Sequence, residues 1–155
     1  MEEVLTIREA TLDDFPMVMS LYRQLQPEDP VLTDGSDFEV FERILASPGL
    51  HLFVAASGSD LVGSIYLNII PNMTRSASPH ALVENVITRQ DLRGTGIGQS
   101  LMAHTLDFAW RKGCYKAMLQ TGSTKASTHG FYEACGFSKE EKTGYLARPP
   151  RNQHS

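Results

Sequence analysis

The sequence predicts one α/β domain in which helices flank a mixed β-sheet, and three observations support this. A chain of 155 residues, 41% hydrophobic and 21% charged, matches one ordinary globular domain and can bury a two-layer core. Short apolar or alternating runs, typical of strands, alternate with segments whose apolar residues recur at helical spacing. A glycine-rich segment at 93–98 joins an apolar run directly to a long amphipathic stretch. The expected order of elements is β-α-α-β-β-β-α-β-α-β.

The first half of the chain is expected to form a strand, two helices and a hairpin. Thr11 can cap the first helix, and Asp14, three residues later, completes a variant of the capping box. Pro27 and Pro30 end that helix. The expected elements are a strand at 4–8, a helix with apolar residues from 15 to 25, a shorter helix around 38–45, and strands at 51–56 and 61–70 joined by a turn at 58–60.

The second half is expected to continue the sheet around one long helix. Residues 71–80 contain two prolines and two serines, which is typical of an exposed loop. Gly113 can cap the end of the long helix, and Arg111 and Lys112 in its last turn suit the helix dipole. The expected elements are a central strand at 81–88, a helix at 96–112, a strand at 117–121, a helix at 126–135 and a last strand at 139–148. We expect residues 1–148 to form the domain and 149–155 a disordered tail.

Charge and cysteine content exclude several classes of protein. A net charge of −4 argues against a general nucleic-acid binder, which normally shows a basic field. The first residues lack the pattern of a secretory signal, and no apolar stretch is long enough to cross a membrane. Cys114 and Cys135 have neither metal-binding nor disulfide spacing. We expect a cytoplasmic protein with reduced thiols and no metal; Cys135 as a nucleophile is the alternative.

The glycine-rich segment predicts an anion site at the start of a helix. There, unpaired N–H groups and the helix dipole favour negative charge, and glycines let the backbone approach a ligand. Gln99 occupies the place of the last glycine of a dinucleotide fingerprint, and no lysine completes a Walker loop. A plain turn is the alternative. The segment consists of Arg93, Gly94, Thr95, Gly96, Ile97 and Gly98, followed by Gln99.

Three segments in order resemble the GCN5-related N-acetyltransferases. Arg93, Gly96 and Gly98 form the R-x-x-G-x-G pattern of the family's pyrophosphate loop. Residues 131–137 read Phe-Tyr-Glu-Ala-Cys-Gly-Phe and resemble the family's F-Y-x-x-x-G-F motif, and residues 82–87 resemble its central strand. The resemblance covers roughly 81–137. It implies the acetyltransferase fold, acetyl-CoA as cosubstrate, and transfer of an acetyl group to a primary amine.

The resemblance also implies roles for individual residues. In the family, the fourth and fifth strands splay apart and the pantetheine arm pairs with the fourth, which would bring residues 86–88 (Val86, Ile87 and Thr88) to the cofactor. The Val86 N–H is then the expected oxyanion donor. Tyr132 is expected to bind the cofactor beside its sulfur and to protonate the leaving thiolate, although a tyrosine on such a helix can also be a core residue. Thr128 stands where relatives often carry a cofactor-binding asparagine.

Glu84 is the expected base for the amine. It is the one carboxylate of the central strand, and apolar neighbours at 82, 83 and 86 would desolvate it and raise its pKa. In the hexosamine-phosphate branch of the family, a glutamate at this place lies near the substrate amine. A structural, ion-paired glutamate is the alternative. Asn85 is expected to bind substrate or to be structural.

Two arginines suggest an anionic acceptor. Arg75 lies in the predicted loop near the acceptor site and Arg148 ends the predicted last strand; each could clamp a phosphate or carboxylate, or simply be solvated. The reading is therefore an N-acetyltransferase acting on a small amine, such as an amino sugar, by direct attack in a ternary complex. Acetylation of a peptide N-terminus or lysine is one alternative, and a non-catalytic acyl-CoA sensor another. Homodimers are common among relatives.

Overall fold

A computed structural model describes residues 4–151, which fall into two compact units. The first unit ends at Gly122 and the second begins at Ser123. The predicted domain at 1–148 spans both units and stays a prediction. Residues 152–155 of the predicted disordered tail lie outside the described residues. Residues 1–3, where a secretory signal was excluded, also lie outside them. No helix among the described residues is long and apolar enough to cross a membrane.

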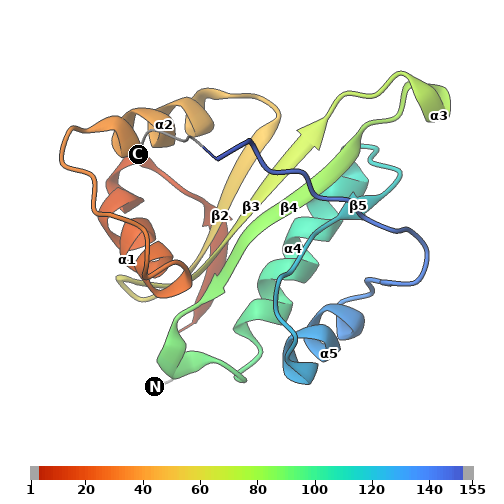
Figure 1. Ribbon diagram of the computed structural model, residues 1–155. Helices are drawn as coiled ribbons and strands as arrows, with labels where there is room; N and C mark the ends of the chain where they lie inside the picture. The colour runs from red at the N-terminus through yellow and green to blue at the C-terminus, as the bar shows by residue number, and fades with distance from the viewer. Residues whose placement is uncertain (1–3, 152–155) are drawn as a thin grey trace. The chain divides into compact units, whose positions relative to one another are not determined.

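The first unit contains a mixed five-stranded sheet, which confirms the predicted fold class (Figure 1). The strands lie in chain order across the sheet; the first four pair antiparallel, and the fourth and fifth pair parallel. Parallel pairing requires a crossover between these two strands, and a long helix provides it. The strands are β1 (Leu5–Glu9), β2 (Leu50–Ser57), β3 (Asp60–Ile70), β4 (His80–Thr88) and β5 (Ala117–Met118).

Helices cover both faces of this sheet. The side chains of β2 alternate between them: Leu52 packs with α1 and α2, whereas Phe53 contacts Phe108 of α4 with ring centroids 5.3 Å apart. Both faces are therefore apolar, which explains the continuous hydrophobic run in β2. The helices are α1 (Phe15–Leu25), α2 (Ser36–Ala46), α3 (Thr74–Ala77) and α4 (Ile97–Arg111), with 3₁₀ turns η1 (Leu12–Asp14) and η2 (Gln90–Leu92).

The predicted capping box is present before α1. The Thr11 N–H donates to Asp14 Oδ2 over 2.7 Å, and Arg8 of β1 donates to both carboxylate oxygens of Asp14 over 2.7 and 3.0 Å. The hydrogen bond from Arg8, together with the one from the Thr11 N–H, lowers the pKa of Asp14 although the residue is buried. This network fixes where the chain turns from the sheet edge into α1.

Gly63 allows α4 to approach the sheet closely. A Cβ atom there would lie 2.8 Å from Leu101 Cδ1 and 3.1 Å from the Ile87 carbonyl oxygen. Leu101 is fully buried, so neither neighbour has free space to move into. The glycine thus sets how closely α4 packs on β3, the strand next to β4.

The second unit contains one helix, α5 (Ala126–Ala134), and irregular chain among its described residues. The predicted strand at 139–148 is wrong, because no described residue there is in a strand. Four charged residues open that segment, and all of its side chains are exposed, so it has no apolar face to bury. Residues 149–151 are also exposed and irregular.

Two further predictions need correction in the first unit. The fifth strand, predicted to reach residue 121, ends at Met118, because the exposed Gln120 and Thr121 precede Gly122. The predicted loop at 71–80 contains the short helix α3, whose residues Arg75, Ser76 and Ala77 have φ between 54° and 60°. These left-handed values show a tight turn and not a regular right-handed helix.

Candidate active site

The side of β4 that faces β5 is open over most of its length. The two strands pair only at Ala81 with Ala117 and at Leu82 with Met118. Among the described residues, β4 therefore has no strand partner on this side from residue 83 to residue 88. An open strand edge offers N–H and C=O groups with which an extended ligand can pair.

The N–H groups of Val86 and Thr88 point towards this open side. The Arg89 N–H donates to the Val62 carbonyl over 2.7 Å, which directs it towards β3. Because successive N–H groups of a strand point to opposite sides, those of residues 88 and 86 point away from β3. The predicted contacts of these two N–H groups with a pantetheine arm stay a prediction.

A bulge interrupts β4 beside these groups. Asn85 and Val86 together oppose the single residue Ile65, and Asn85 has φ of 51°. A bulge inserts one residue and re-aims the strand, and it is common beside active sites. The bulge also explains why odd-numbered residues at the two ends of β4 direct their N–H groups to opposite sides. The Ala81 N–H donates to the Lys116 carbonyl over 2.9 Å, towards β5, whereas the Arg89 N–H points towards β3.

A half-buried tyrosine of α1 lies next to the bulge. Burial raises the pKa of Tyr22 to about 12, and the neighbouring side chains of Asn85 and Ser64 lower it by less. Ser64 is itself fully buried and donates to the Phe53 carbonyl over 3.0 Å. Sequence reasoning assigned Tyr22 only to the apolar face of a helix; no local signal pairs it with Asn85, 63 positions later in the chain.

The glycine-rich segment follows β4 and begins α4, as predicted. Gly94 and Gly96 have φ of 81° and 92°, and a Cβ at either position would meet no atom within 4 Å. The first helical hydrogen bond is donated by Ser100 to the Gly96 carbonyl over 3.1 Å, so the N–H groups of residues 97–99 precede it. Unpaired N–H groups at the start of a helix can bind an anion such as a diphosphate, and this contact stays a prediction.

Glu84 is exposed, which contradicts its predicted desolvation. Its apolar neighbours in sequence do not cover it, because Val83 points into the core on the opposite face of the strand and Val86 lies in the bulge. Asn85 is exposed as well.

Arg75 lies in a basic cluster at the beginning of β4. Its guanidinium carbon lies 5.7 Å from the centre of the Tyr115 ring, and Lys116 Nζ lies 5.4 Å from the same centre. His80 packs edge-on against this ring, at 6.2 Å between centroids. We refer to Arg75, His80, Tyr115 and Lys116 as the Tyr115 cluster. Its two cations are compatible with the predicted anion clamp, which stays a prediction.

The second unit carries the remaining predicted residues. Tyr132 of α5 is half-buried, and burial and the nearby Cys135 raise its pKa, so its phenol is protonated at neutral pH. Thr128 Oγ1 accepts a hydrogen bond from Ser123 Oγ over 3.1 Å. Arg148 is exposed and lies outside any strand. Among the described residues, no group of three or more metal-binding side chains could hold a metal ion.

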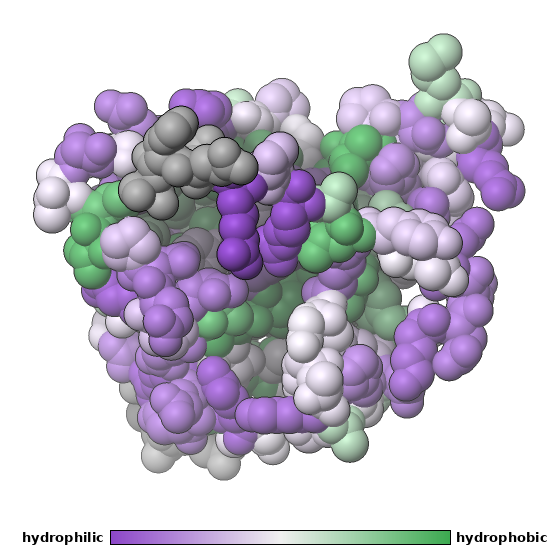
Figure 2. Space-filling model, viewed as in Figure 1, coloured by the Kyte–Doolittle hydropathy of each residue, from purple (hydrophilic) through white to green (hydrophobic). Residues whose placement is uncertain are grey.

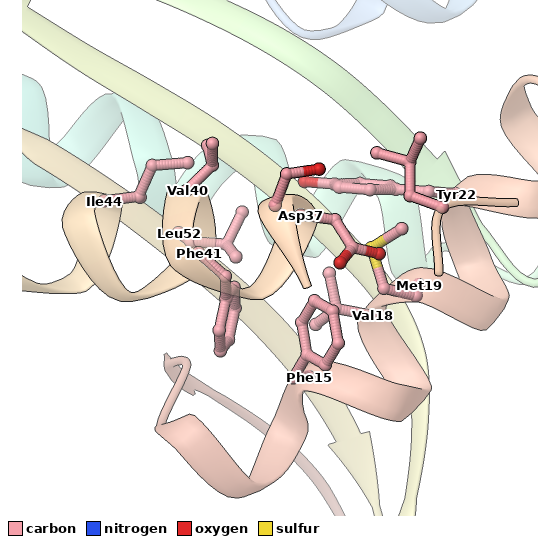
Figure 3. A pocket seen from close by; sticks show the side chains of 11 residues that line it. Phe15, Val18, Met19, Tyr22, Asp37, Val40, Phe41, Ile44 and Leu52 are labelled. Atoms are coloured by element: carbon pink, nitrogen blue, oxygen red, sulfur yellow. The ribbon is translucent and has the colours of Figure 1, made fainter. Parts of the chain in front are cut away.

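Sequence reasoning missed an apolar cleft between α1 and α2. Its volume is about 300 Å³, and Figure 3 shows aromatic and aliphatic side chains from both helices converging on it, with Asp37 among them. No motif marks this cleft, because its walls come from separate segments of the chain. The lining residues are Phe15, Val18, Met19, Tyr22, Leu32, Ser36, Asp37, Val40, Phe41, Ile44 and Leu52.

Comparisons with known proteins show which family the chain resembles. Residues 15–137 match the profile of the acetyltransferase (GNAT) family. A Trypanosoma brucei brucei protein named glucosamine 6-phosphate N-acetyltransferase is 33% identical over 82 residues, which cover 53% of this chain and about half, 54%, of that relative. A Stenotrophomonas maltophilia protein named aminoglycoside N(6')-acetyltransferase type 1 is 24% identical over 147 residues, 93% of each chain.

A solved structure is more similar over a longer part of the chain. The protein of Agrobacterium tumefaciens str. C58, assigned as an acetyltransferase, is 42% identical to this chain. The match has a TM-score of 0.88 and covers 93% of this chain and 99% of the other.

Proposed function

Because the chain belongs to the acetyltransferase (GNAT) family, we propose that it acetylates the primary amine of a small molecule by direct attack in a ternary complex. Family membership confirms the predicted family, the enzyme class and acetyl-CoA as cosubstrate. The observation that carries the proposal is the open side of β4, which leads directly into the glycine-rich start of α4.

The first unit supplies the groups that would hold acetyl-CoA, which brings the acetyl group as a thioester. N–H groups at the start of α4, with Arg93 beside them, bind the diphosphate, and those of Val86 and Thr88 on β4 hold the extended arm. The Val86 N–H also stabilises the developing oxyanion, a contact worth about 3 kcal/mol of barrier. Contacts with Ile87, Thr95, Gln99 and Thr128 belong to the same proposal.

Two side chains move protons in this proposal. Glu84 accepts the proton that the alkylammonium must lose before attack; because it is exposed, this transfer takes place with water in reach. Tyr132 donates its proton to the departing thiolate, and its raised pKa keeps the phenol fully protonated at neutral pH. Arg75, Asn85 and Arg148 stay predicted substrate contacts. A cytoplasmic location and a homodimer also stay predictions.

The Tyr132→Phe variant tests this function. We expect the rate of the chemical step to fall by about a hundredfold or more, because the thiolate must then leave unprotonated. Calorimetry should show unchanged affinity for acetyl-CoA. Tyr145→Phe is the matched control, since Tyr145 is 91% exposed in the same unit. Full single-turnover rates for Tyr132→Phe would show that the acid is another group.

A further inference from the structure

We infer that the cleft between α1 and α2 binds the apolar body of a cationic acceptor amine, such as a phenyl ring on a short alkyl chain. This inference rests on the proposed function and names the class of acceptor. It differs from an anionic amino sugar, which the two arginines suggested. The evidence is the lining of the cleft, its position beside the bulge of β4, and the charge around it.

The cleft is lined almost entirely by carbon. Figure 3 shows Phe15, Val18 and Met19 of α1 facing Val40 and Ile44 of α2 across it. A sugar phosphate placed there would leave its hydroxyl and phosphate groups without partners, which is costly. A volume of about 300 Å³ lies at the small end of the range for ligand pockets and suits a single ring with a short chain.

The cleft reaches the proposed reaction centre through Tyr22. Tyr22 lines the cleft, and its hydroxyl lies near enough to the Asn85 side chain, in the bulge of β4, for that side chain to affect its pKa. The neighbouring Val86 carries the N–H that we propose for the oxyanion. An amine on a short chain, anchored by its ring in the cleft, would therefore extend towards the residues that handle the acetyl group.

The segment around the cleft attracts cations and repels anions. Residues 15–46, which form α1, α2 and the segment between them, contain six carboxylates, all within residues 24–42, and two arginines, Arg23 and Arg43. Asp37 itself lines the cleft, and the other five carboxylates are exposed. A field of one sign raises the local concentration of ligands of the opposite sign. The carboxylates are Glu28, Asp29, Asp34, Asp37, Glu39 and Glu42.

Apolar surface also lines the way into the cleft. Val31 and Leu32, in the segment joining α1 and α2, are 67% and 48% exposed, and Leu32 lines the cleft. Figure 2 shows green, apolar surface at the left margin, where this segment runs in Figure 1, with purple surface next to it. An apolar body with one positive charge matches both kinds of surface.

Competition between two acceptors tests the inference. We expect kcat/KM for 2-phenylethylamine to exceed that for glucosamine 6-phosphate by about tenfold or more, because the free energy of burying one aromatic ring corresponds to a factor of this size. Calorimetry on the protein saturated with CoA should show 2-phenylethylamine binding without turnover. A preference for the sugar phosphate, or no reaction and no binding of 2-phenylethylamine, would overturn the inference. If acetyl-CoA still bound, the proposed function would stand.

Matched variants locate the effect in the cleft. Val40→Lys places a cation among the lining residues at a site already 46% exposed, so folding should tolerate it. Its affinity for 2-phenylethylamine should fall about tenfold, because the ring loses its pocket and the amine is repelled. Val4→Lys makes the same change at an 80% exposed site that does not line the cleft, and should have no effect. Equal losses in both variants would overturn the inference.

A second pair of variants tests the charge. Asp37→Asn keeps the size of the side chain and removes the one carboxylate that lines the cleft. Its KM for 2-phenylethylamine should rise several-fold, while Asp13→Asn, which removes an exposed carboxylate outside residues 24–42, should leave KM unchanged. An unchanged KM in Asp37→Asn would contradict the proposed attraction.

Discussion

The glycine-rich start of α4 and the cleft between α1 and α2 differ in which part of the chain would contact a ligand. The first is made of backbone: N–H groups at residues 97–99, with glycines at φ of 81° and 92° before them. The second is made of side chains from α1, α2 and β2, which meet only in the folded chain. Backbone N–H groups do not depend on the side chains, so the glycine-rich start can bind the same ligand in many relatives. The cleft is lined by side chains, so exchange of a few of them changes which ligand it binds. The cosubstrate therefore follows from the family, and the acceptor depends on this chain.

The Glu84→Gln variant tests a group that the proposed reaction needs whichever acceptor binds. Glu84 lies on β4 directly before the bulge, and the glycine-rich segment follows the end of that strand. Glu84→Gln should lower kcat at neutral pH by about a hundredfold, because the ammonium loses its proton acceptor. The rate should recover as the pH rises and the free amine becomes abundant. A pH–rate profile with each acceptor measures this. A profile identical to that of the wild type would mean that bulk water takes the proton.

The Gly96→Ala variant should affect the backbone site alone. A side chain at φ of 92° costs about 1–2 kcal/mol, so the turn shifts and affinity for acetyl-CoA falls about tenfold. Gly113→Ala is the control at the other end of α4, with φ of 87° and equally open surroundings. Both variants should lose similar stability in thermal unfolding. Equal losses of acetyl-CoA affinity in the two would contradict a binding role for the glycine segment.

The Asp14→Asn variant should affect the wall of the cleft without touching the backbone site. We expect a loss of about 1 kcal/mol in the free energy of unfolding at neutral pH, since Arg8 is 40% exposed and its pairing is screened. The folded-state pKa of Asp14 is lowered, so its contribution is complete above the unfolded value, near pH 4, and disappears as the pH falls further.

Urea titrations over a pH series check this expectation. The difference between wild type and Asp14→Asn should be constant near neutrality and shrink below about pH 4. Acetyl-CoA affinity should not change. A difference that persisted undiminished at low pH would show that the Asp14 carboxylate does not act through its charge.

Added salt should weaken binding of the cationic amine at the cleft, and this effect should be smaller than those of the variants above. The carboxylates of residues 24–42 are mostly exposed, so added salt screens their attraction for a cationic amine. We expect KM for 2-phenylethylamine to rise about two- to threefold between low and high salt, with kcat unchanged. Glucosamine 6-phosphate should show no such rise. A KM for the cationic amine that falls with salt would contradict the proposed field.

The sequence predicted best what depends on local backbone geometry. The spacing of Thr11 and Asp14 predicted a capping box, and Gly96 before an amphipathic run predicted the start of α4; both depend on residues a few positions apart. The burial of Glu84 was wrong, because apolar neighbours along a strand do not determine what covers a side chain from another element.

The cleft could not be predicted because its parts are distant in the sequence. Phe15 and Leu52 belong to different elements, and each looks like an ordinary core residue by itself. The prediction of the last strand was wrong for a related reason: a segment forms a strand only where a sheet edge and an apolar face are available, and residues 139–148 are all exposed.

Hydrogen exchange at individual amides of β4 tests the central claim most directly. Binding of acetyl-CoA should slow exchange at Val86 and Thr88, whose N–H groups face the open side of the strand. Arg89, which already donates to Val62 over 2.7 Å, should change little. Unchanged exchange at Val86 and Thr88 with acetyl-CoA saturating the protein would contradict the account, because the cosubstrate would then be held elsewhere.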